Sequence, residues 1–297
     1  MQKILLLGSS GQLGYELKRS LIYISELLAL NHNNFNYLDF EKLGSTVKDF
    51  KPNVIINASA YTNVDKAESE IDQAYLINEK LPHQLALLAK SSGASLIHYS
   101  TDYVFSGNSR TPYLENDPVG PIGIYGKSKL AGEIRIAEIN PDYIIFRTAW
   151  LYGHYGKNFY KRMIQLAKEK ETLKIVNDQF GCPTTARMLA FITSHIISSC
   201  PNGFSGRKGI YHAVSCGECS WYEFANLIIE NAVPEFQKMV KNIIPVTSDQ
   251  YVTVAKRPAY SVLNNNKLRS AFNINIPDWK DLLMQHLEDK VWAEIDE

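Results

Sequence analysis

Short apolar runs alternate with amphipathic segments through the first half of the chain. Each run has the length of one buried strand, and the runs lie at residues 4–7, 27–30, 54–57, 95–100 and 143–147. Hydrophobic positions with helical spacing fall between them, at residues 12–21, 73–91 and 125–138. Strict alternation of strands and helices predicts a parallel sheet covered on both faces. Such a sheet binds ligands beyond the carboxyl ends of its strands, where the strand order reverses.

The pattern changes after Trp150. Helices are predicted at about residues 158–170 and 185–198, and a stretch rich in Gly, Pro and Ser at 201–209 predicts a linker. We therefore expect an α/β fold: a Rossmann-type, doubly wound parallel sheet with a smaller, discontinuous α+β substrate domain. The expected dinucleotide-binding domain comprises residues 1–152 plus about 185–200. The expected substrate domain comprises residues 153–184 plus 201–297, and the helix after Thr185 returns to pack on the first sheet.

Charge and composition narrow the classes of partner. The 297 residues include 31 basic and 31 acidic side chains, so the chain lacks the excess of Lys and Arg that binds nucleic acids or anionic membrane surfaces. A nucleic-acid or membrane partner is therefore not expected, and a small molecule fits better. The first apolar run is far too short to span a bilayer.

The four cysteines include one CxxC pair, Cys216 and Cys219. A zinc site needs a second ligand pair at a suitable spacing, and the sequence has none. We therefore expect no metal site, and a cytoplasmic protein in a reducing compartment.

A glycine loop follows the first predicted strand, with Gly8, Gly11 and Gly14 separated by two residues each. Glycines between a strand and a helix let backbone amides approach a pyrophosphate, while the helix N-terminus supplies partial positive charge. A tight turn in a protein that binds no nucleotide has the same pattern. This spacing is similar to that of extended short-chain dehydrogenases.

The end of the second predicted strand bears on cofactor choice. An acid there binds the ribose of NAD and repels a 2′-phosphate, but the chain has Asn31 and His32. Without an acid, and without an arginine to bind the phosphate, we expect NADPH to be favoured weakly or both NADPH and NADH to be used. Asp39 and Phe40 follow in the next predicted loop and are candidates to bracket the adenine.

Tyr125 and Lys129 are the candidate catalytic pair. Four residues are about one helical turn, so the phenol and the ammonium emerge on the same face. A neighbouring cation favours the phenolate, and we expect it to lower the pKa of Tyr125. The alternative is a surface lysine on a solvated helix, equivalent to Lys127.

The strand at residues 95–100 ends in hydroxyl side chains. Thr101 is the candidate to bind a substrate carbonyl beside Tyr125, with Ser100 as a competitor; a simple strand cap is the alternative. His98 lies inside this apolar strand and is expected to be a core histidine. Trp150 is a candidate to pack on a sugar ring, or a core tryptophan.

With these residues assembled, the chain resembles the dTDP-4-dehydrorhamnose reductases, a family of extended short-chain dehydrogenases, over nearly its full length. The segments that carry the resemblance are residues 64–68, 98–105, 125–129, 147–150, 177–184, 257–258 and 277–279.

The resemblance implies reduction of the C4 ketone of dTDP-4-dehydro-β-L-rhamnose by NAD(P)H, in which Tyr125 donates the proton. It places Thr101 and Asp102 at the substrate carbonyl and Trp150 on the sugar. The residues that it implies for dinucleotide contacts are Gly11, Gln12, Leu13, Asp39, Phe40, Ser59, Ala60, Tyr61, Tyr125 and Lys129, beside the remaining loop glycines Gly8 and Gly14. Some members form dimers through bound Mg²⁺, so a homodimer is possible, and no Mg²⁺ site is evident from this sequence.

Three alternatives share the scaffold. A nucleotide-sugar 4,6-dehydratase places a second acid after the threonine and its acid, where this chain has Tyr103. An epimerase remains possible on fold alone. A non-catalytic binding protein, similar to the regulatory subunit of methionine adenosyltransferase, is disfavoured by the intact Thr101, Tyr125 and Lys129.

Overall fold

The computed structural model describes residues 1–139, 141–234 and 237–289. Six parallel strands form the central sheet in the order β10-β5-β4-β3-β1-β2. Their bounds are β1 Gln2–Leu7, β2 Ser25–Leu30, β3 Val54–Asn57, β4 Ser95–Thr101, β5 Asp142–Thr148 and β10 Gly209–His212. The predicted doubly wound, parallel α/β fold is confirmed.

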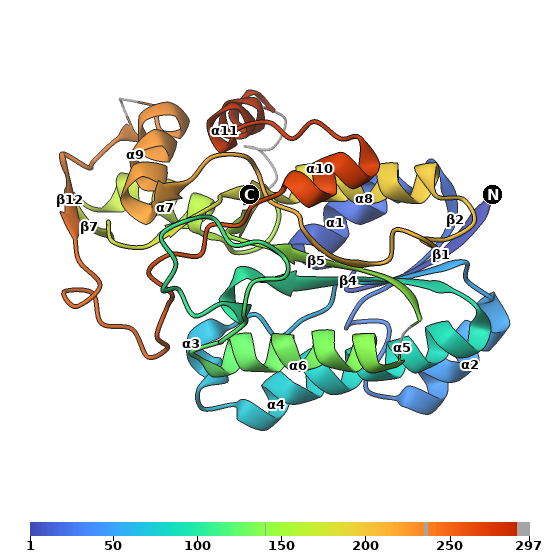
Figure 1. Cartoon of the computed structure of the whole chain (residues 1–297). Coiled ribbons are helices and arrows are strands. Elements are labelled where there is room, and N and C mark those ends of the chain that lie inside the picture. Colours follow the sequence, from blue (N-terminus) through green and yellow to red (C-terminus); the bar gives the residue numbers. More distant parts are fainter. Residues whose placement is uncertain (140, 235–236, 290–297) are drawn as a thin grey trace.

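Helices cover both faces of the sheet (Figure 1). One face carries α1 Gln12–Leu21, α8 Ala186–Ser199 and α10 Asn266–Phe272. The other carries α2 Phe40–Phe50, α5 Leu81–Ser92 and α6 Ile124–Ile139. Strand side chains alternate between the two cores, because successive residues of a strand point to opposite faces: Leu6 lies in the first core, and Leu5 and Leu7 in the second.

A smaller lobe packs beyond the carboxyl edge of the sheet, at the left of Figure 1. It contains α7 Phe159–Glu169, β7 Thr172–Val176, α9 Trp221–Ala232, β12 Asn242–Val246 and α11 Trp279–Glu288. A third core of mainly aromatic and aliphatic side chains holds these elements together, and Tyr152, Phe224 and Trp279 belong to it. Three short strand pairs complete the lobe: β6 Leu151–Tyr152 with β9 Thr184–Thr185, β8 Phe180–Gly181 with β11 Cys219–Ser220, and β7 with β12.

Three details differ from the expectations. Helix α2 begins at Phe40, where a loop was predicted. The predicted helix 73–91 consists of α4 Ile71–Tyr75, one π-helical turn, η1 Leu76–Lys80, and then α5. Strand β10 lies in the segment 201–297 assigned to the substrate domain, yet it pairs with β5 in the central sheet.

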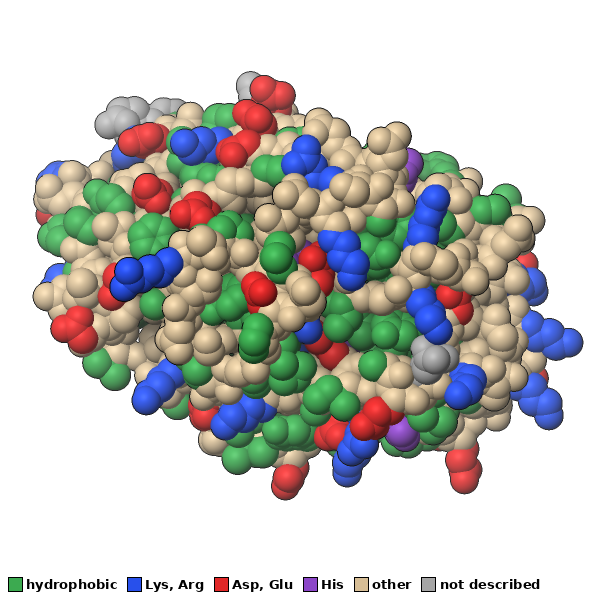
Figure 2. All heavy atoms as spheres, viewed as in Figure 1, with side chains coloured by type: hydrophobic (Ala, Val, Ile, Leu, Met, Phe, Trp, Pro, Cys, Tyr) green, Lys and Arg blue, Asp and Glu red, His purple; other side chains and the backbone are tan. Residues whose placement is uncertain are grey.

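Charges are distributed evenly over the visible surface. Figure 2 shows Lys and Arg interspersed with Asp and Glu on this face, in keeping with the equal numbers of each sign. Among the helices of the described ranges, none has the length and apolar character needed to cross a membrane.

Candidate active site

The site lies where the strand order reverses. From β1 the chain crosses first to β2 on one side and then to β3 on the other. In doubly wound folds the loops after two such strands diverge and form the ligand-binding crevice at the carboxyl edge of the sheet. The glycine loop follows β1, residues 58–61 follow β3, and Thr101 ends β4. The predicted site residues of these three segments therefore meet at one edge of the sheet.

Two of the three loop glycines have a clear steric reason. Gly8 has φ +84°, and a Cβ there would lie 2.6 Å from the backbone of Ala58 and Ser59. Gly14 packs so closely on the loop that a Cβ would overlap the carbonyl of Gly8. The Gly11 N–H donates to Gly8 O at 2.9 Å, and Gly11 then caps α1. The loop thus brings the N-terminus of α1 to the crevice, as an anion site requires.

Gln12 connects the glycine loop to the smaller lobe. Its amide nitrogen donates to Leu151 O at 2.9 Å, and its oxygen accepts from Asn158 Nδ2 at 2.6 Å. The Leu13 side chain is buried in the first core, so only its backbone faces the crevice. The hydrogen bond between Gln12 and Asn158 was not predicted. The two residues lie far apart in the sequence, and no motif around either of them indicates the contact.

The end of β2 presents amide, hydroxyl and imidazole groups. Asn31 Oδ1 accepts from the amides of Asn33 and Asn34, at 2.9 and 3.3 Å. Ser10 Oγ lies 3.3 Å from His32 Nδ1. Residues 31–34, which follow the strand, include no acid in the sequence.

A loop was predicted at Asp39 and Phe40, and this prediction is wrong. The two residues lie at the start of helix α2. Asp39 is the N-cap of α2 and accepts from Lys42 N at 3.0 Å, and Phe40 packs against the second core. Tyr37, which was not singled out, accepts from Gly8 N and donates to Leu30 O, both at 3.0 Å. Its phenol braces the glycine loop against β2.

The segment after β3 is anchored to α6. Tyr61 N donates to the fully buried Asn78, which donates to Ser128 Oγ at 3.0 Å. Asn78 lies in the π-helical turn, a feature often found at functional sites. Ser59 Oγ donates to Asn57 Oδ1 at 2.6 Å. The loop at residues 59–61 is therefore held against α6, the helix that carries the candidate catalytic pair.

Thr101, Tyr125 and Lys129 come together at this edge. Tyr125 is hydrogen-bonded to the Thr101 side chain, and the alternative Ser100 makes no such contact among the described residues. Lys129 is 1% exposed, whereas Lys127 is exposed, so the two lysines are not equivalent. A surface role for Lys129 is excluded.

The electrostatics of the pair differ from expectation. Burial raises the pKa of Tyr125 to about 12, although its hydrogen bond with Thr101 acts in the opposite direction. The predicted lowering of this pKa by Lys129 is wrong for this arrangement, because Lys129 Nζ donates to Tyr99 O at 2.5 Å. Burial lowers the pKa of Lys129 to about 8, and the negative charge of Glu133 partly opposes this effect.

Asp102 lies directly behind the hydroxyl of Thr101. Thr101 Oγ1 donates to Asp102 Oδ1 at 3.0 Å. Asp102 is 2% exposed, and burial raises the pKa of its carboxyl to about 7, against the effect of hydrogen bonds from Ser261 and Thr101. A carboxyl and a phenol, both of perturbed pKa, thus flank one threonine hydroxyl, which is typical of a site for proton transfer.

Trp150 connects the edge of β5 to the smaller lobe. It has φ +44°, an unusual conformation for a large side chain, and its ring stacks on Trp221 with centroids 3.4 Å apart. Gly181 permits this position, since a Cβ there would overlap the Trp150 ring. Contact of Trp150 with a sugar remains a prediction.

A cavity of about 1480 Å³ lies in the smaller lobe, lined in part by Arg257. Arg257 is hydrogen-bonded to Tyr103, and the Tyr103 ring meets Tyr125 edge-on with centroids 5.8 Å apart. Tyr125 and Lys129 are not among the lining residues, and Arg257 connects the cavity to Tyr125 indirectly, through Tyr103. The lining is basic and aromatic, and includes Lys157, Lys161, Arg162, Lys170, Lys174, Phe159, Trp221 and Tyr251.

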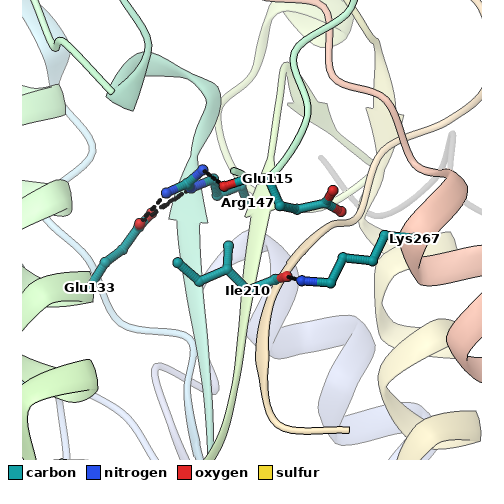
Figure 3. Close-up of polar contacts among 5 residues, drawn as sticks. All are labelled: Glu115, Glu133, Arg147, Ile210 and Lys267. Atoms are coloured by element: carbon teal, nitrogen blue, oxygen red, sulfur yellow. Dashed lines mark hydrogen bonds and ion pairs between the residues drawn. The ribbon is translucent and has the colours of Figure 1, made fainter. Parts of the chain in front are cut away.

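A buried ion pair holds α6 against the sheet. Arg147 of β5 donates to Glu133 of α6 through Nε and Nη2, the latter at 2.7 Å, and both side chains are nearly inaccessible (Figure 3). Arg147 Nη1 also donates to Glu115 O at 3.3 Å. Arg147 belongs to a segment that carries the family resemblance, but the sequence alone indicated no role for it.

No group of three or more His, Cys, Asp or Glu in the described part of the chain is arranged to hold a metal ion. Cys216 and Cys219 are free thiols.

The sheet topology, the glycine loop and the Thr–Tyr–Lys arrangement define a protein of the short-chain dehydrogenase/reductase class. The chain belongs to the family described as "RmlD substrate binding domain", whose model matches residues 1–291.

Relatives are similar over nearly their whole length. A protein of Burkholderia thailandensis named dTDP-4-dehydrorhamnose reductase is 42% identical over 284 residues, covering 94% of this chain and 95% of the relative. A protein of the same name from Escherichia coli K12 is 43% identical, covering 93% and 94%. The crystal structure of dTDP-4-dehydrorhamnose reductase from Bacillus anthracis in complex with NADP superposes with a TM-score of 0.89 at 35% identity, covering 97% of this chain and 99% of the other.

Proposed function

We propose that this chain is an NAD(P)H-dependent reductase that converts dTDP-4-dehydro-β-L-rhamnose to dTDP-β-L-rhamnose. The interaction of the Tyr125 phenol with the Thr101 side chain, at the carboxyl end of β4, carries the proposal, because a proton donor and a second hydroxyl could then act on one substrate oxygen. The name shared by relatives that are 42% and 43% identical supports this substrate. A nicotinamide cofactor, bound as NADP is in the Bacillus anthracis relative, would supply hydride to the C4 carbon.

Tyr125 is the proposed acid. With its pKa raised to about 12, the phenol keeps its proton at neutral pH. It then releases the proton to the alkoxide that develops at C4, which is more basic than a phenolate. Thr101 is proposed to turn its hydroxyl proton from Asp102 Oδ1 to the same oxygen and so hold the ketone against Tyr125.

Lys129 is proposed to act as a buried cation beside the reacting groups. Its pKa of about 8 leaves it mainly protonated at neutral pH. The ammonium has already used one proton on Tyr99 O, and another can bind the nicotinamide ribose. Asp102, behind Thr101, is proposed to accept a hydrogen bond from a sugar hydroxyl, and Trp150 to pack on the sugar.

The basic cavity supports a nucleotide-linked substrate. A nucleoside diphosphate carries negative charge and a flat base, and this cavity offers Lys and Arg side chains together with aromatic rings. We propose that the diphosphate and base of the substrate bind there, with the sugar directed past Arg257 toward Tyr125.

The glycine loop and the end of β2 would hold the dinucleotide. Gly11, Gln12 and Leu13 present the first backbone amides of α1, where a pyrophosphate fits. Ser10, Asn31 and His32 would offer hydrogen-bonding groups to the adenosine ribose without a carboxylate, so NADPH is proposed as the main cofactor and NADH as a second. Ser59, Ala60, Tyr61, Asp39 and Phe40 are proposed to contact the dinucleotide.

We propose, from the family resemblance, that the protein is located in the cytoplasm and forms a homodimer.

The dehydratase alternative is disfavoured by Tyr103. This residue is paired with Arg257, and it stands where a dehydratase has its second acid, directly after Asp102.

The test is an NADPH oxidation assay with dTDP-, GDP- and UDP-linked 4-keto sugars. We expect oxidation with the dTDP-linked 4-keto sugar. Tyr125→Phe should lower kcat by roughly 10²- to 10⁴-fold while NADPH binding is kept. Tyr143→Phe, at the opposite end of the sheet, is the matched control and should remain active. Unchanged turnover in Tyr125→Phe would refute the acid assignment, and no oxidation with any of the sugars would favour the binding-protein alternative.

A further inference from the structure

His98 is a buried histidine in direct contact with the candidate catalytic lysine. It lies in the middle of β4 with no exposed surface. Its Nε2 is 3.4 Å from Lys129 Nζ, and its Nδ1 is 3.1 Å from Asn57 Nδ2. A histidine that only filled the core would need one partner for its N–H. This one joins two polar side chains in a continuous chain.

The chain of hydrogen bonds continues to the crevice. Asn57 ends β3, and its Oδ1 accepts from Ser59 Oγ at 2.6 Å and from Ser59 N at 3.2 Å. Ser59 is half-buried and lies in the loop proposed to contact the dinucleotide. The order along the chain is therefore Ser59, Asn57, His98 and Lys129.

A neutral imidazole has one N–H and one acceptor nitrogen, so this chain can run in only two directions. If Asn57 Nδ2 donates to His98 Nδ1, then Nε2 carries the hydrogen and points it at Lys129, which must offer a lone pair as a neutral amine. If Lys129 is an ammonium and donates to Nε2, then Nδ1 carries the hydrogen and needs an acceptor.

The second direction is reached by turning one amide. Rotation of the Asn57 amide by half a turn brings its oxygen to His98 Nδ1 and its nitrogen to Ser59 Oγ, with no other heavy atom displaced. The Ser59 hydroxyl proton and the Ser59 N–H then lose Asn57 as their acceptor. The hydroxyl proton becomes available to an acceptor in the crevice, such as an oxygen of the dinucleotide, whereas the backbone N–H still points at the Asn57 side chain, which is now a donor.

We propose that His98 is a positioning residue that accepts a hydrogen bond from the Lys129 ammonium and couples the charge of Lys129 to the hydrogen-bonding direction of Asn57 and Ser59. A charged Lys129 and a free hydroxyl donor on Ser59 then occur together. By reciprocity, an acceptor that binds Ser59 favours the charged lysine. The kinetic test below rests on the proposed function, whereas the spectroscopic test does not.

Other ionisable groups also act on Lys129 and its partners, and an experiment must separate them from His98. Glu133 on α6 acts on Lys129 directly, and Arg147 on β5 pairs with Glu133. Asp102 after β4 acts on Tyr125, which lies one helical turn before Lys129. Burial lowers the pKa of His98 well below its usual value, so the ring stays neutral and acts through its tautomer rather than through charge.

The first experiment is nitrogen NMR of the full chain labelled with ¹⁵N-histidine, with the His98 signals assigned by their loss in His98→Gln. At pH 7 we expect the tautomer with hydrogen on Nδ1. As Lys129 loses its proton at higher pH, the hydrogen should move to Nε2. A tautomer that carries hydrogen on Nε2 at every pH would overturn the proposal, whether or not the protein reduces a sugar.

The second experiment compares the pH profiles of kcat/KM for His98→Leu and His98→Gln, with His195→Leu on α8 as the control. Without an acceptor the ammonium is less stable, so the limb due to Lys129 should move by about one pH unit toward lower pH in His98→Leu. His98→Gln restores an acceptor and should move the limb back, and the KM for the sugar nucleotide should stay unchanged in both. A limb at the wild-type position in folded His98→Leu would refute the coupling. If His98→Leu does not fold, the tautomer measurement decides.

Discussion

A carboxylate oxygen of Glu68 accepts a hydrogen bond of 2.8 Å from the backbone nitrogen of Ile124. The Glu68 side chain, directly after helix α3 Val64–Ala67, therefore caps the helix that carries Tyr125. The first turn of a helix has N–H groups without intrahelical partners and a partial positive charge, and a carboxylate satisfies both. Gly123 allows the approach, since a Cβ there would lie 2.8 Å from the same oxygen.

We expect Glu68→Ala to lower the free energy of unfolding by about 1 kcal/mol, the usual effect of losing an N-cap. It should also lower kcat more than it raises KM for NADPH, because the displaced group is the phenol of Tyr125. Urea unfolding and steady-state kinetics measure the two effects. Glu68→Gln keeps an acceptor at the same place and is the matched control. Equal stability of Glu68→Ala and wild type would show that the cap is not used.

The ion pair between Glu133 and Arg147 predicts a strongly coupled pair of substitutions. Removing one partner leaves a buried charge, so Arg147→Met alone should cost about 3–5 kcal/mol in the free energy of unfolding. The double variant Glu133→Leu/Arg147→Met should recover most of this loss, because no charge is then left without a partner. A double-mutant cycle in urea gives the coupling energy, and additive losses would contradict it.

The same double variant separates stability from catalysis. Glu133 raises the pKa of Lys129 against the effect of burial, so its removal should move the Lys129 limb of the kcat/KM profile to lower pH even where stability recovers. The profile should be recorded beside Glu138→Leu, a substitution of an exposed acid on the same helix.

The sequence predicted best what depends on short-range pattern. Strands β1, β3 and β4 are buried on both faces and have continuous apolar runs, and two of the three glycines after β1 have steric reasons that hold in any such loop. Helix α2 escaped prediction because Gly44, Ser45 and Thr46 interrupt its apolar spacing and only Leu43 and Val47 are buried. The edge position of β10 depends on pairing with β5, which a single sequence does not encode locally.

The residues of the site were predictable, but not their ionisation. Spacing placed Tyr125 and Lys129 one turn apart, and the structure keeps them on one face. Spacing could not show that Lys129 turns to Tyr99 O and His98, or that burial outweighs charge at Tyr125. These effects come from β4 and β5, which approach α6 only in the folded chain.

Replacing Asp102 with an uncharged residue should increase the free energy of unfolding by an amount that depends on pH. Its folded pKa of about 7 lies above the ordinary value of 3.8, so the folded state binds the proton more tightly than the unfolded state. The stabilising effect of that proton is complete below pH 3.8 and is lost as the pH rises to about 7. Asp102→Asn, which carries no charge, should gain little at pH 4 and up to about 4 kcal/mol above pH 7.

Chemical denaturation of wild type and Asp102→Asn at several pH values tests this. Asp49→Asn, at an exposed position of α2, is the control and should show no such trend. The gain should come with a loss of turnover if Asp102 binds the sugar. A stability difference that is constant between pH 4 and 8 would contradict the raised pKa.

Asn31→Asp should change the cofactor preference toward NADH. Asn31 uses its Oδ1 to accept from the amides of Asn33 and Asn34, and an aspartate can make the same two bonds, so the turn after β2 should be kept. The added carboxylate would bind the ribose hydroxyls of NADH and repel the 2′-phosphate of NADPH. We expect the Kd for NADPH to rise by about tenfold or more, equivalent to about 1.4 kcal/mol, while the Kd for NADH stays the same or falls. Fluorescence titration of both cofactors measures the change.

The control variant is Asn33→Asp, which adds the same charge at an exposed position two residues away. If both variants have an equal effect on the Kd for NADPH, general charge repulsion, not a contact at the ribose, sets the cofactor preference.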